Sequence, residues 1–296
     1  MKHTIPLILV LCLLLCGCSS SAQPAQVAAT TLPVYTFTSR LCEGTGISVT
    51  QLVTEAVSCL HDYSLNVSQV KAAEAAELIV ISGAGLEEFM EDLLPDTETI
   101  DSSRGISLIW PEEAHHEHDH DHGHGSEEHH HDQDPHIWLS PANARLMAAN
   151  IWEGLCRHYP AQEPIFTKNL HKLTAELDLL ESYAAQSLEK LSCRELITFH
   201  DGFAYFAEAF DLQILEAVEE ESGSEASAKE LIHLIQEVEH HNLPAIFTEK
   251  NGSVSAAGII ARETGCESFA LDMAMSGNDY FDAMYHNINT IKEALG

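Results

Sequence analysis

Three histidines and one aspartate lie where predicted strands give way to loops. His61, His136 and His200 each lie in such a connection, and Asp272 follows the short predicted strand 269–271. In open α/β sheets, ligands bind beyond the carboxyl ends of the strands. Three imidazoles and a carboxylate suit zinc, whereas manganese and magnesium prefer mostly oxygen ligands. Each residue taken singly has an ordinary explanation, a surface histidine or a helix cap, so the hypothesis of a metal site depends on all four together.

A second group of histidines occupies one segment of the chain. No apolar residue larger than Ala114 occurs in residues 112–134, so this segment cannot bury a hydrophobic face and is predicted to be a mobile loop. We interpret it as an auxiliary metal-binding loop that raises the local metal concentration; the alternative is a solvated acidic linker. Its histidines are interleaved with Asp, Glu and Gly: His115, His116, His118, His120, His122, His124, His129, His130 and His131.

The composition narrows the class of partner. The 46 Asp and Glu residues outnumber the 14 Lys and Arg residues, which gives a net charge of −32. Nucleic acid and anionic lipid headgroups would repel such a chain, so nucleic acid is excluded as a partner. A hydrophobic content of 45% is typical of a globular protein, and 296 residues are enough for two domains. Because histidine is the commonest side-chain metal ligand, its 19 copies indicate metal binding.

The N-terminus predicts export from the cytoplasm. Lys2 precedes an apolar run over residues 7–16 that is too short to span a bilayer but has the length of a signal-peptide core. The run ends in Leu-Cys-Gly-Cys, which is typical of a bacterial lipobox with Cys18 as the lipidated residue. Residues 19–25 would then be a flexible tether. A plain secretory signal, or Cys16 as the lipid acceptor, are the alternatives. We therefore expect an extracytoplasmic protein that is lipid-anchored to the bacterial cell membrane.

Strands alternate with helices along the rest of the chain, which predicts parallel sheets. Expected strands cover 27–30, 47–53, 78–81, 195–199, 212–217, 245–248 and 269–271, and expected helices cover 33–42, 67–77, 86–94, 141–155, 166–191, 202–209, 228–240, 254–264 and 280–295. The helix 166–191 carries an apolar stripe and is long enough to join two lobes. The predicted organisation is a signal peptide (1–18), a tether (19–25), an N-terminal α/β lobe (26–160), a linking helix (161–192) and a C-terminal α/β lobe (193–296).

The cysteines give no metal or redox motif. Five cysteines follow Cys18, and no two of them form a C-x-x-C pair. An export compartment permits disulfides, but the odd number leaves at least one thiol free unless it pairs between chains.

Several ordered motifs resemble one family. They are His61 to Leu65, Ala76 to Val80, Gly83 to Glu87, Asp134 to Pro141, Phe199 to Phe206, and the C-terminal segment that contains Tyr280, Met284 and Asn287. Together they resemble the ZnuA/TroA-like metal-binding proteins of ABC importers, also called cluster A-I substrate-binding proteins. The resemblance covers residues 26–296 and depends most on the segment Asp134 to Pro141.

The resemblance implies two α/β lobes joined by a long helix, with the metal in the cleft between them. Its ligands would be His61, His136, His200 and Asp272, although some zinc members complete the shell with water in place of the carboxylate. Manganese-selective members typically have a carboxylate at the third position, so His200 favours zinc, as does the histidine-rich loop. One departure is Leu60, where the family commonly has proline or an acidic residue.

The function implied by the resemblance is capture of Zn(II) and its delivery to an importer composed of a membrane permease and a cytoplasmic ATPase. Manganese binding within the same family and surface adhesion are the alternatives. A metal-dependent hydrolase is a more distant one, suggested by the pairs His61-Asp62 and His200-Asp201. No H-E-x-x-H motif supplies a general base, so we expect a binding protein that is not an enzyme.

Overall fold

The structure is a computed structural model that describes residues 25–57, 60, 63–110, 133–218 and 226–296. Several predictions lie outside the described residues: the signal peptide with Cys18, the first ligand His61, and the histidines between residues 115 and 131.

The N-terminal half forms a four-stranded parallel sheet in the order β2-β1-β3-β4. Its strands are β1 (Val27–Ala29), β2 (Val49–Gln51), β3 (Leu78–Ile81) and β4 (Thr99–Asp101). The connections contain α2 (Leu32–Cys42), α3 (Val67–Ala75) and the 3-10 turns of η2 (Glu88–Asp96). The central strands β1 and β3 are almost completely buried, as expected for strands covered on both faces.

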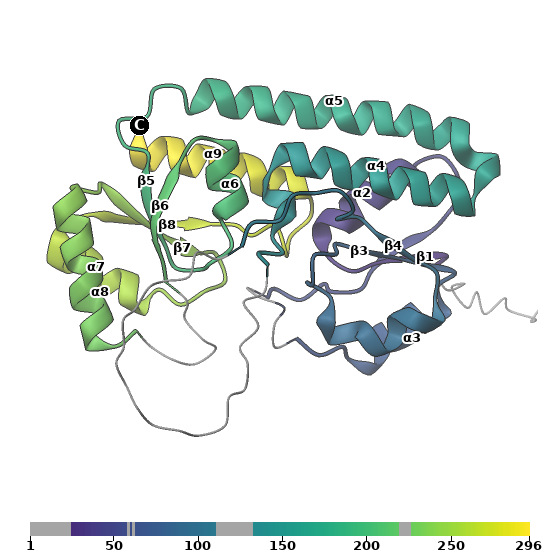
Figure 1. The fold of residues 1–296 in the computed structure, drawn as a ribbon, viewed down its shortest axis with the longest axis horizontal. Coiled ribbons are helices and arrows are strands. Elements are labelled where there is room, and N and C mark those ends of the chain that lie inside the picture. The colour runs from purple at the N-terminus through teal and green to yellow at the C-terminus, as the bar shows by residue number, and fades with distance from the viewer. Residues whose placement is uncertain (1–24, 58–59, 61–62, 111–132, 219–225) are drawn as a thin grey trace, which may run out of the picture.

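The C-terminal half repeats this topology. Its parallel sheet has the order β6-β5-β7-β8, with β5 (Glu195–Thr198), β6 (Gln213–Ala217), β7 (Ala245–Glu249) and β8 (Glu267–Leu271). The accompanying helices are α6 (Ala204–Ala209), α7 (Ala228–His241), α8 (Ser255–Thr264) and α9 (Tyr280–Leu295). The two sheets lie at opposite ends of the molecule (Figure 1). The predicted fold class, two α/β lobes with parallel sheets, is thus confirmed.

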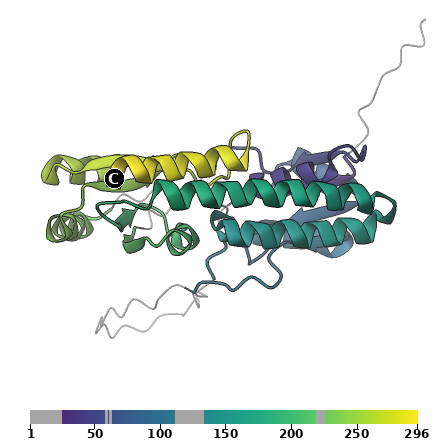
Figure 2. The ribbon, with the colours of Figure 1, turned by 90° about the horizontal axis from the view of Figure 1, so that it is seen from above.

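A long helix runs across both lobes. Helix α5 (Glu163–Ser187) has 25 residues, which gives a length of about 37 Å, and it packs on α2 and α4 (Pro141–His158) at one end and on α9 at the other. Figure 2 shows it extending over both halves of the molecule. Its buried stripe of Phe166, Leu173, Leu177, Leu180 and Ala184 follows the spacing of an amphipathic helix.

A side chain caps the helix that follows His136. The Ser140 hydroxyl accepts a hydrogen bond from the Asn143 amide, and Pro141 occupies the first turn of α4. This cap fixes the start of α4 directly after the short 3-10 turn η3 (Ile137–Leu139), which follows His136.

Buried hydrogen bonds join the two halves. The Trp138 indole donates to the Met273 carbonyl (2.8 Å), and the Tyr280 hydroxyl donates to the Trp138 carbonyl (2.8 Å). The Tyr205 hydroxyl donates to the Asp134 carbonyl (3.1 Å). One continuous hydrophobic core also contains residues of both lobes. Because a packed core resists deformation, we expect the lobes to move little against each other.

Two local predictions were wrong. The segment 86–94 was expected to be an α-helix, but it consists of 3-10 turns that a non-helical Met90 (φ −132°) interrupts. The turn before it, Gly83 to Gly85, has three consecutive positive φ angles, which delay the start of regular structure. Strand β4 was not predicted, because its three residues contain only one apolar side chain, Ile100, and give no readable alternation.

Within the described part of the chain, no helix combines the length and the apolar character that a membrane span requires.

Candidate metal centre

His136 is buried between the lobes and is held by one carboxylate. Its side chain is 3% exposed. Oδ1 of Asp134 accepts from the His136 backbone amide (2.8 Å) and lies 2.8 Å from its Nδ1. A carboxylate can only accept, so Nδ1 carries the proton in this pair and Nε2 is left with its lone pair. This tautomer is the one that ligates a metal through Nε2.

His200 meets His136 from the other lobe. It follows the carboxyl end of β5, and its Nε2 lies 3.5 Å from Nε2 of His136, with the rings almost perpendicular at 83°. Its Nδ1 lies 3.8 Å from Oε2 of Glu249, a carboxyl that is 3% exposed. Both imidazoles therefore have a buried carboxyl group on the Nδ1 side and face each other with Nε2.

The distance between the two Nε2 atoms fits a shared metal better than a hydrogen bond. Hydrogen bonds between nitrogen and an acceptor have a modal length of about 2.9–3.0 Å, so 3.5 Å is at the long limit. Two nitrogens that each lie about 2.0–2.1 Å from a tetrahedral zinc are separated by about 3.4 Å. The two Nε2 atoms are thus spaced as two ligands of one tetrahedral ion.

Gly202 has no side chain, and the space that a side chain would fill is the one in which the two imidazoles meet. A Cβ atom at this position would lie 2.5 Å from Cε of Met273, 2.8 Å from Cδ2 of His200 and 3.0 Å from Cε1 of His136. Any larger residue would displace at least one ring, which explains why glycine follows the His-Asp pair here.

Asp272 lies at the predicted place but has a partner that the sequence analysis did not consider. It directly follows β8, its side chain is 6% exposed, and Oδ2 pairs with Nζ of Lys250 at 2.8 Å. Oδ1 accepts from the Ala274 amide (2.9 Å), and the Asn287 side chain bonds both to the amide and to the carbonyl of Asp272. The backbone of this residue is therefore fixed at the carboxyl edge of the sheet.

The structure brings together two of the four predicted ligands. His136 and His200 meet, Asp272 lies at the same edge of the C-terminal sheet in an ion pair, and His61 lies outside the described residues. Among the residues that are described, no three His, Cys, Asp or Glu side chains are close enough to hold a metal ion.

Sequence reasoning missed Glu249. It ends β7, the strand between β5 and β8, and its Oε1 has no hydrogen-bond partner within the described part of the chain. Burial, and secondarily the charge of Asp272, raises the pKa of Glu249 to about 8. Its position at the end of a central strand was a usable signal, because His200 and Asp272 were selected by the same rule.

A buried carboxyl also fixes the loops of the N-terminal sheet. Glu87 accepts from the Thr30 hydroxyl (2.6 Å) and from the amides of Ser82 (2.6 Å) and Gly83 (2.9 Å). These residues follow β1 and β3, so one side chain joins two loops at the carboxyl edge. Burial raises the pKa of Glu87 to about 7, although its hydrogen bonds act in the opposite direction.

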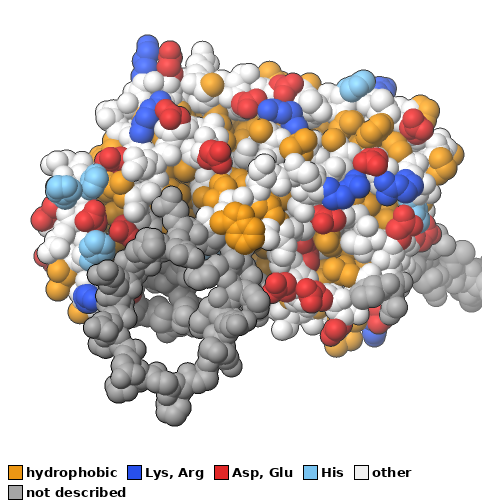
Figure 3. All heavy atoms as spheres, in the orientation of Figure 1, with side chains coloured by type: hydrophobic (Ala, Val, Ile, Leu, Met, Phe, Trp, Pro, Cys, Tyr) orange, Lys and Arg blue, Asp and Glu red, His pale blue; other side chains and the backbone are white. Residues whose placement is uncertain are grey.

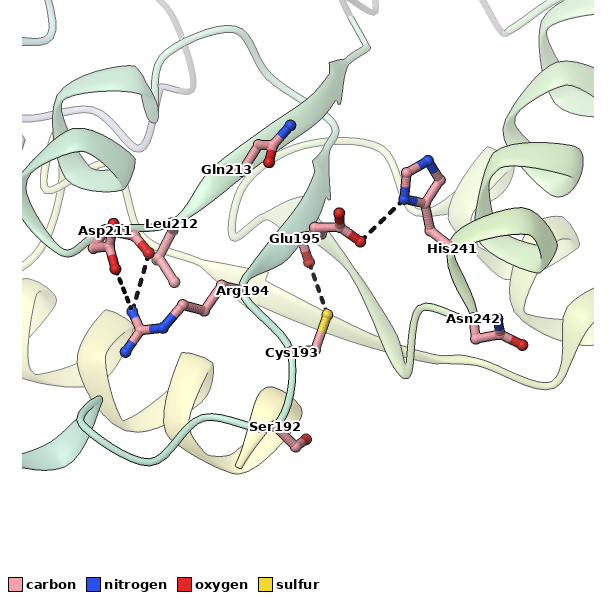
Figure 4. Close-up of a pocket in the computed structure, with 9 residues that line it drawn as sticks. All are labelled: Ser192, Cys193, Arg194, Glu195, Asp211, Leu212, Gln213, His241 and Asn242. Atoms are coloured by element: carbon pink, nitrogen blue, oxygen red, sulfur yellow. Dashed lines mark hydrogen bonds and ion pairs between the residues drawn. The ribbon is translucent and has the colours of Figure 1, made fainter.

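A pocket of about 560 Å³ lies elsewhere in the C-terminal lobe (Figure 4). It is lined by Glu195 and Gln213 at the amino ends of β5 and β6, whereas His200 follows the carboxyl end of β5. Its charged groups are paired: His241 Nδ1 lies 3.0 Å from Glu195, and Arg194 donates to backbone carbonyls. This pocket is therefore separate from the histidine pair.

Residues 27–294 match the model of the family described as "ZnuA: Zinc-uptake complex component A periplasmic". The chain belongs to the ZnuA family. Its membership covers both lobes and the joining helix, and the family is that of an extracytoplasmic binding component. Cys42, Cys156, Cys193 and Cys266, the cysteines that the structure describes, are all free, so none of them forms a disulfide in this ZnuA-family fold.

Curated relatives extend over most of the chain. The high-affinity zinc uptake system protein ZnuA of Bacillus subtilis is 29% identical over 304 residues, which cover 95% of this chain and 92% of the relative. The zinc-binding protein TroA of Treponema pallidum is 27% identical over 260 residues, which cover 79% of this chain and 78% of TroA. The zinc-binding lipoprotein AdcA of Streptococcus pneumoniae is 28% identical over 99% of this chain, which spans only 61% of the length of AdcA.

Solved structures agree with this membership. A crystal structure of ZnuA superposes with a TM-score of 0.78 at 28% identity and covers 92% of this chain and all of the other. A zinc-bound ZnuA from which residues 138–173 of that protein were deleted gives a TM-score of 0.75, also at 28% identity. The superposition covers 92% of this chain and 98% of the other.

Proposed function

We propose that this protein captures Zn(II) outside the cytoplasm and delivers it to an ABC importer, whose permease spans the membrane and whose ATPase acts in the cytoplasm. The observation that carries the proposal is the pair of Nε2 atoms of His136 and His200, 3.5 Å apart, each with a buried carboxyl on the other side of its ring. Membership of the zinc-uptake family and the names of the relatives support the same cargo.

The proposed zinc shell consists of His61, His136, His200 and Asp272. Neutral imidazoles favour zinc over manganese, because manganese prefers oxygen ligands. Four protein ligands leave no open coordination position for water or substrate. A shell of this kind binds and releases an ion without performing chemistry on another molecule, so the protein is proposed to be a carrier and not an enzyme.

Release is proposed to begin at the contacts that join the ligand segments. The Trp138 indole bonds to the residue after Asp272, and Trp138 itself lies two residues after His136. A permease that displaces either lobe therefore moves ligands from both segments. The proposed units are residues 26–160 and 193–296, with 161–192 as the linking helix between them.

Two accessory features complete the proposal. Cys18 is the proposed lipidation site, with residues 19–25 as the tether, and the histidines between 115 and 131 are a proposed auxiliary capture loop. On the face of the molecule in Figure 3, Lys and Arg side chains are interspersed with Asp and Glu, an arrangement unlike the basic stripe of a nucleic-acid-binding protein.

Titration of zinc and manganese against the protein without residues 1–25 tests this function. One tight zinc per chain is expected, and His136→Ala or His200→Ala should each abolish it. His233→Ala is the matched control, because this exposed histidine pairs with Glu216 on the surface of the C-terminal lobe. Tight zinc binding that survives both His136→Ala and His200→Ala would contradict the proposal.

A further inference from the structure

Lys250 and Asp272 leave the C-terminal sheet side by side. Strands β7 and β8 are parallel neighbours in which Glu249 pairs with Leu271, so the next residue on each strand is Lys250 and Asp272 respectively. The Lys250 amide donates to the Leu271 carbonyl at 2.8 Å, which extends the ladder by one hydrogen bond. Register alone therefore places the ammonium group within reach of the carboxylate.

The ion pair joins an accessible cation to a buried anion. Nζ of Lys250 lies 2.8 Å from Oδ2 of Asp272, and the side chains are 53% and 6% exposed respectively. Oδ1 of the same carboxylate accepts from the Ala274 amide. Among the described residues, each oxygen of Asp272 thus has one donor, and of these two donors the one on Oδ2 can leave without moving the backbone.

We propose that Lys250 is a specificity-determining residue, whose ammonium group holds Oδ2 of Asp272 in the zinc-free protein and competes with the incoming metal for that oxygen. This inference depends on the proposed function, because it takes Asp272 as a ligand. On metal binding, the Lys250 side chain exchanges Asp272 for water, which its half-exposed position allows.

The competition does not affect all metals equally. Zinc obtains most of its binding energy from imidazole nitrogens, whereas manganese depends more on carboxylate oxygen. An ammonium group that is paired with the carboxylate therefore weakens manganese binding more than zinc binding. Repulsion between the ammonium group and a divalent ion acts in the same direction until Lys250 has moved away.

The experiment compares Lys250→Met, which keeps the length of the side chain but removes its charge, with Lys250→Arg, which retains the charge. Lys292→Met on α9 is the control, because this lysine is exposed in the last turn of a different element. Zinc and manganese affinities are measured by competition with a chelator. We expect Lys250→Met to tighten zinc by about three- to fivefold, the upper part of the range that exposed ion pairs contribute. Manganese should tighten by a larger factor, and Lys250→Arg should remain within about twofold of the wild type.

A second measurement follows the ion pair itself. The nitrogen chemical shift of the Lys250 side chain, detected through its Cε protons and assigned by its absence in Lys250→Met, should change when one equivalent of zinc is added. In an Asp272→Asn background, Lys250→Met should have no further effect on zinc affinity, because the two residues are predicted to act through one contact.

The outcomes separate the inference from the proposed function. Unchanged metal affinities in Lys250→Met, or equal tightening in Lys250→Met and Lys250→Arg, would overturn the role of Lys250 if His136→Ala still abolishes tight zinc. Tight zinc in His136→Ala would refute the proposed function itself. Urea unfolding of the metal-free variants establishes that each is folded before its affinity is interpreted.

Discussion

Replacement of Asp134 by asparagine tests how the protein orients its buried histidine. Oδ1 of Asp134 accepts from both the backbone amide and Nδ1 of His136, each at 2.8 Å, and the side chain is 8% exposed. Asparagine has the same shape and keeps one oxygen acceptor, but it carries no charge. The variant Asp134→Asn therefore removes the electrostatic part of the contact and leaves the packing almost unchanged.

The expected loss follows from the hydrogen bond. A hydrogen bond to a charged group contributes about 1.5–3 kcal/mol, and a neutral one about 0.5–1.5 kcal/mol. The difference of about 1–2 kcal/mol corresponds to about a 5- to 30-fold weaker zinc affinity. Altering the hydrogen-bond partner of a metal-bound histidine typically lowers metal affinity by about 10- to 100-fold, and the two ranges overlap. Burial strengthens the effect, because little water is available to replace the lost charge.

The assay is zinc titration against a fluorescent chelator at pH 7.5, together with urea unfolding of the metal-free protein. Asp211→Asn is the matched control: its carboxylate is 94% exposed, it lies at the opposite end of β5 from His200, and asparagine tolerates its positive φ of 54°. A zinc affinity of Asp134→Asn within twofold of the control would refute the argument that this carboxylate prepares His136 for the metal.

Three further substitutions have defined outcomes. Gly202→Ala places a methyl group against both imidazoles and should weaken zinc affinity by about tenfold or more. Gly258→Ala is the control, because open space surrounds this glycine, and its zinc affinity should not change. The chelator titration measures both affinities. Trp138→Phe leaves the buried Met273 carbonyl without its donor and should lower the free energy of unfolding in urea by about 1–3 kcal/mol. The pKa of Glu87 is about 7 in the folded protein and 4.5 in its ordinary range, so its contribution to stability is complete below pH 4.5 and is lost as the pH rises through 7. Between pH 5 and pH 8, the metal-free protein should lose about 2–3 kcal/mol more of its free energy of unfolding in urea than Glu87→Gln loses.

The parts of the site that the sequence could predict are those that follow from strand ends. His200 and Asp272 each follow the carboxyl end of a strand in one parallel sheet, and such ends meet at one edge. His136 precedes a helix start marked by Ser140 and Pro141, which places it in an ordered connection. The alternation of strands and helices likewise sufficed for the two α/β lobes.

The parts that the sequence could not predict depend on register and on short-range geometry. The pairing of Lys250 with Asp272 requires knowledge that β7 and β8 are neighbours in a particular register. The role of Glu249 depends on its burial beside His200, which composition and spacing do not reveal. The break at Met90 and the positive φ angles at Gly83 to Gly85 become visible only in the folded backbone.

The most direct test of the central claim is an anomalous diffraction map, recorded at the zinc edge from crystals of the protein with one equivalent of zinc. The account predicts one strong peak about 2.0–2.1 Å from Nε2 of both His136 and His200. A peak that contacts neither imidazole, for example one bound only by histidines between residues 115 and 131, would contradict it.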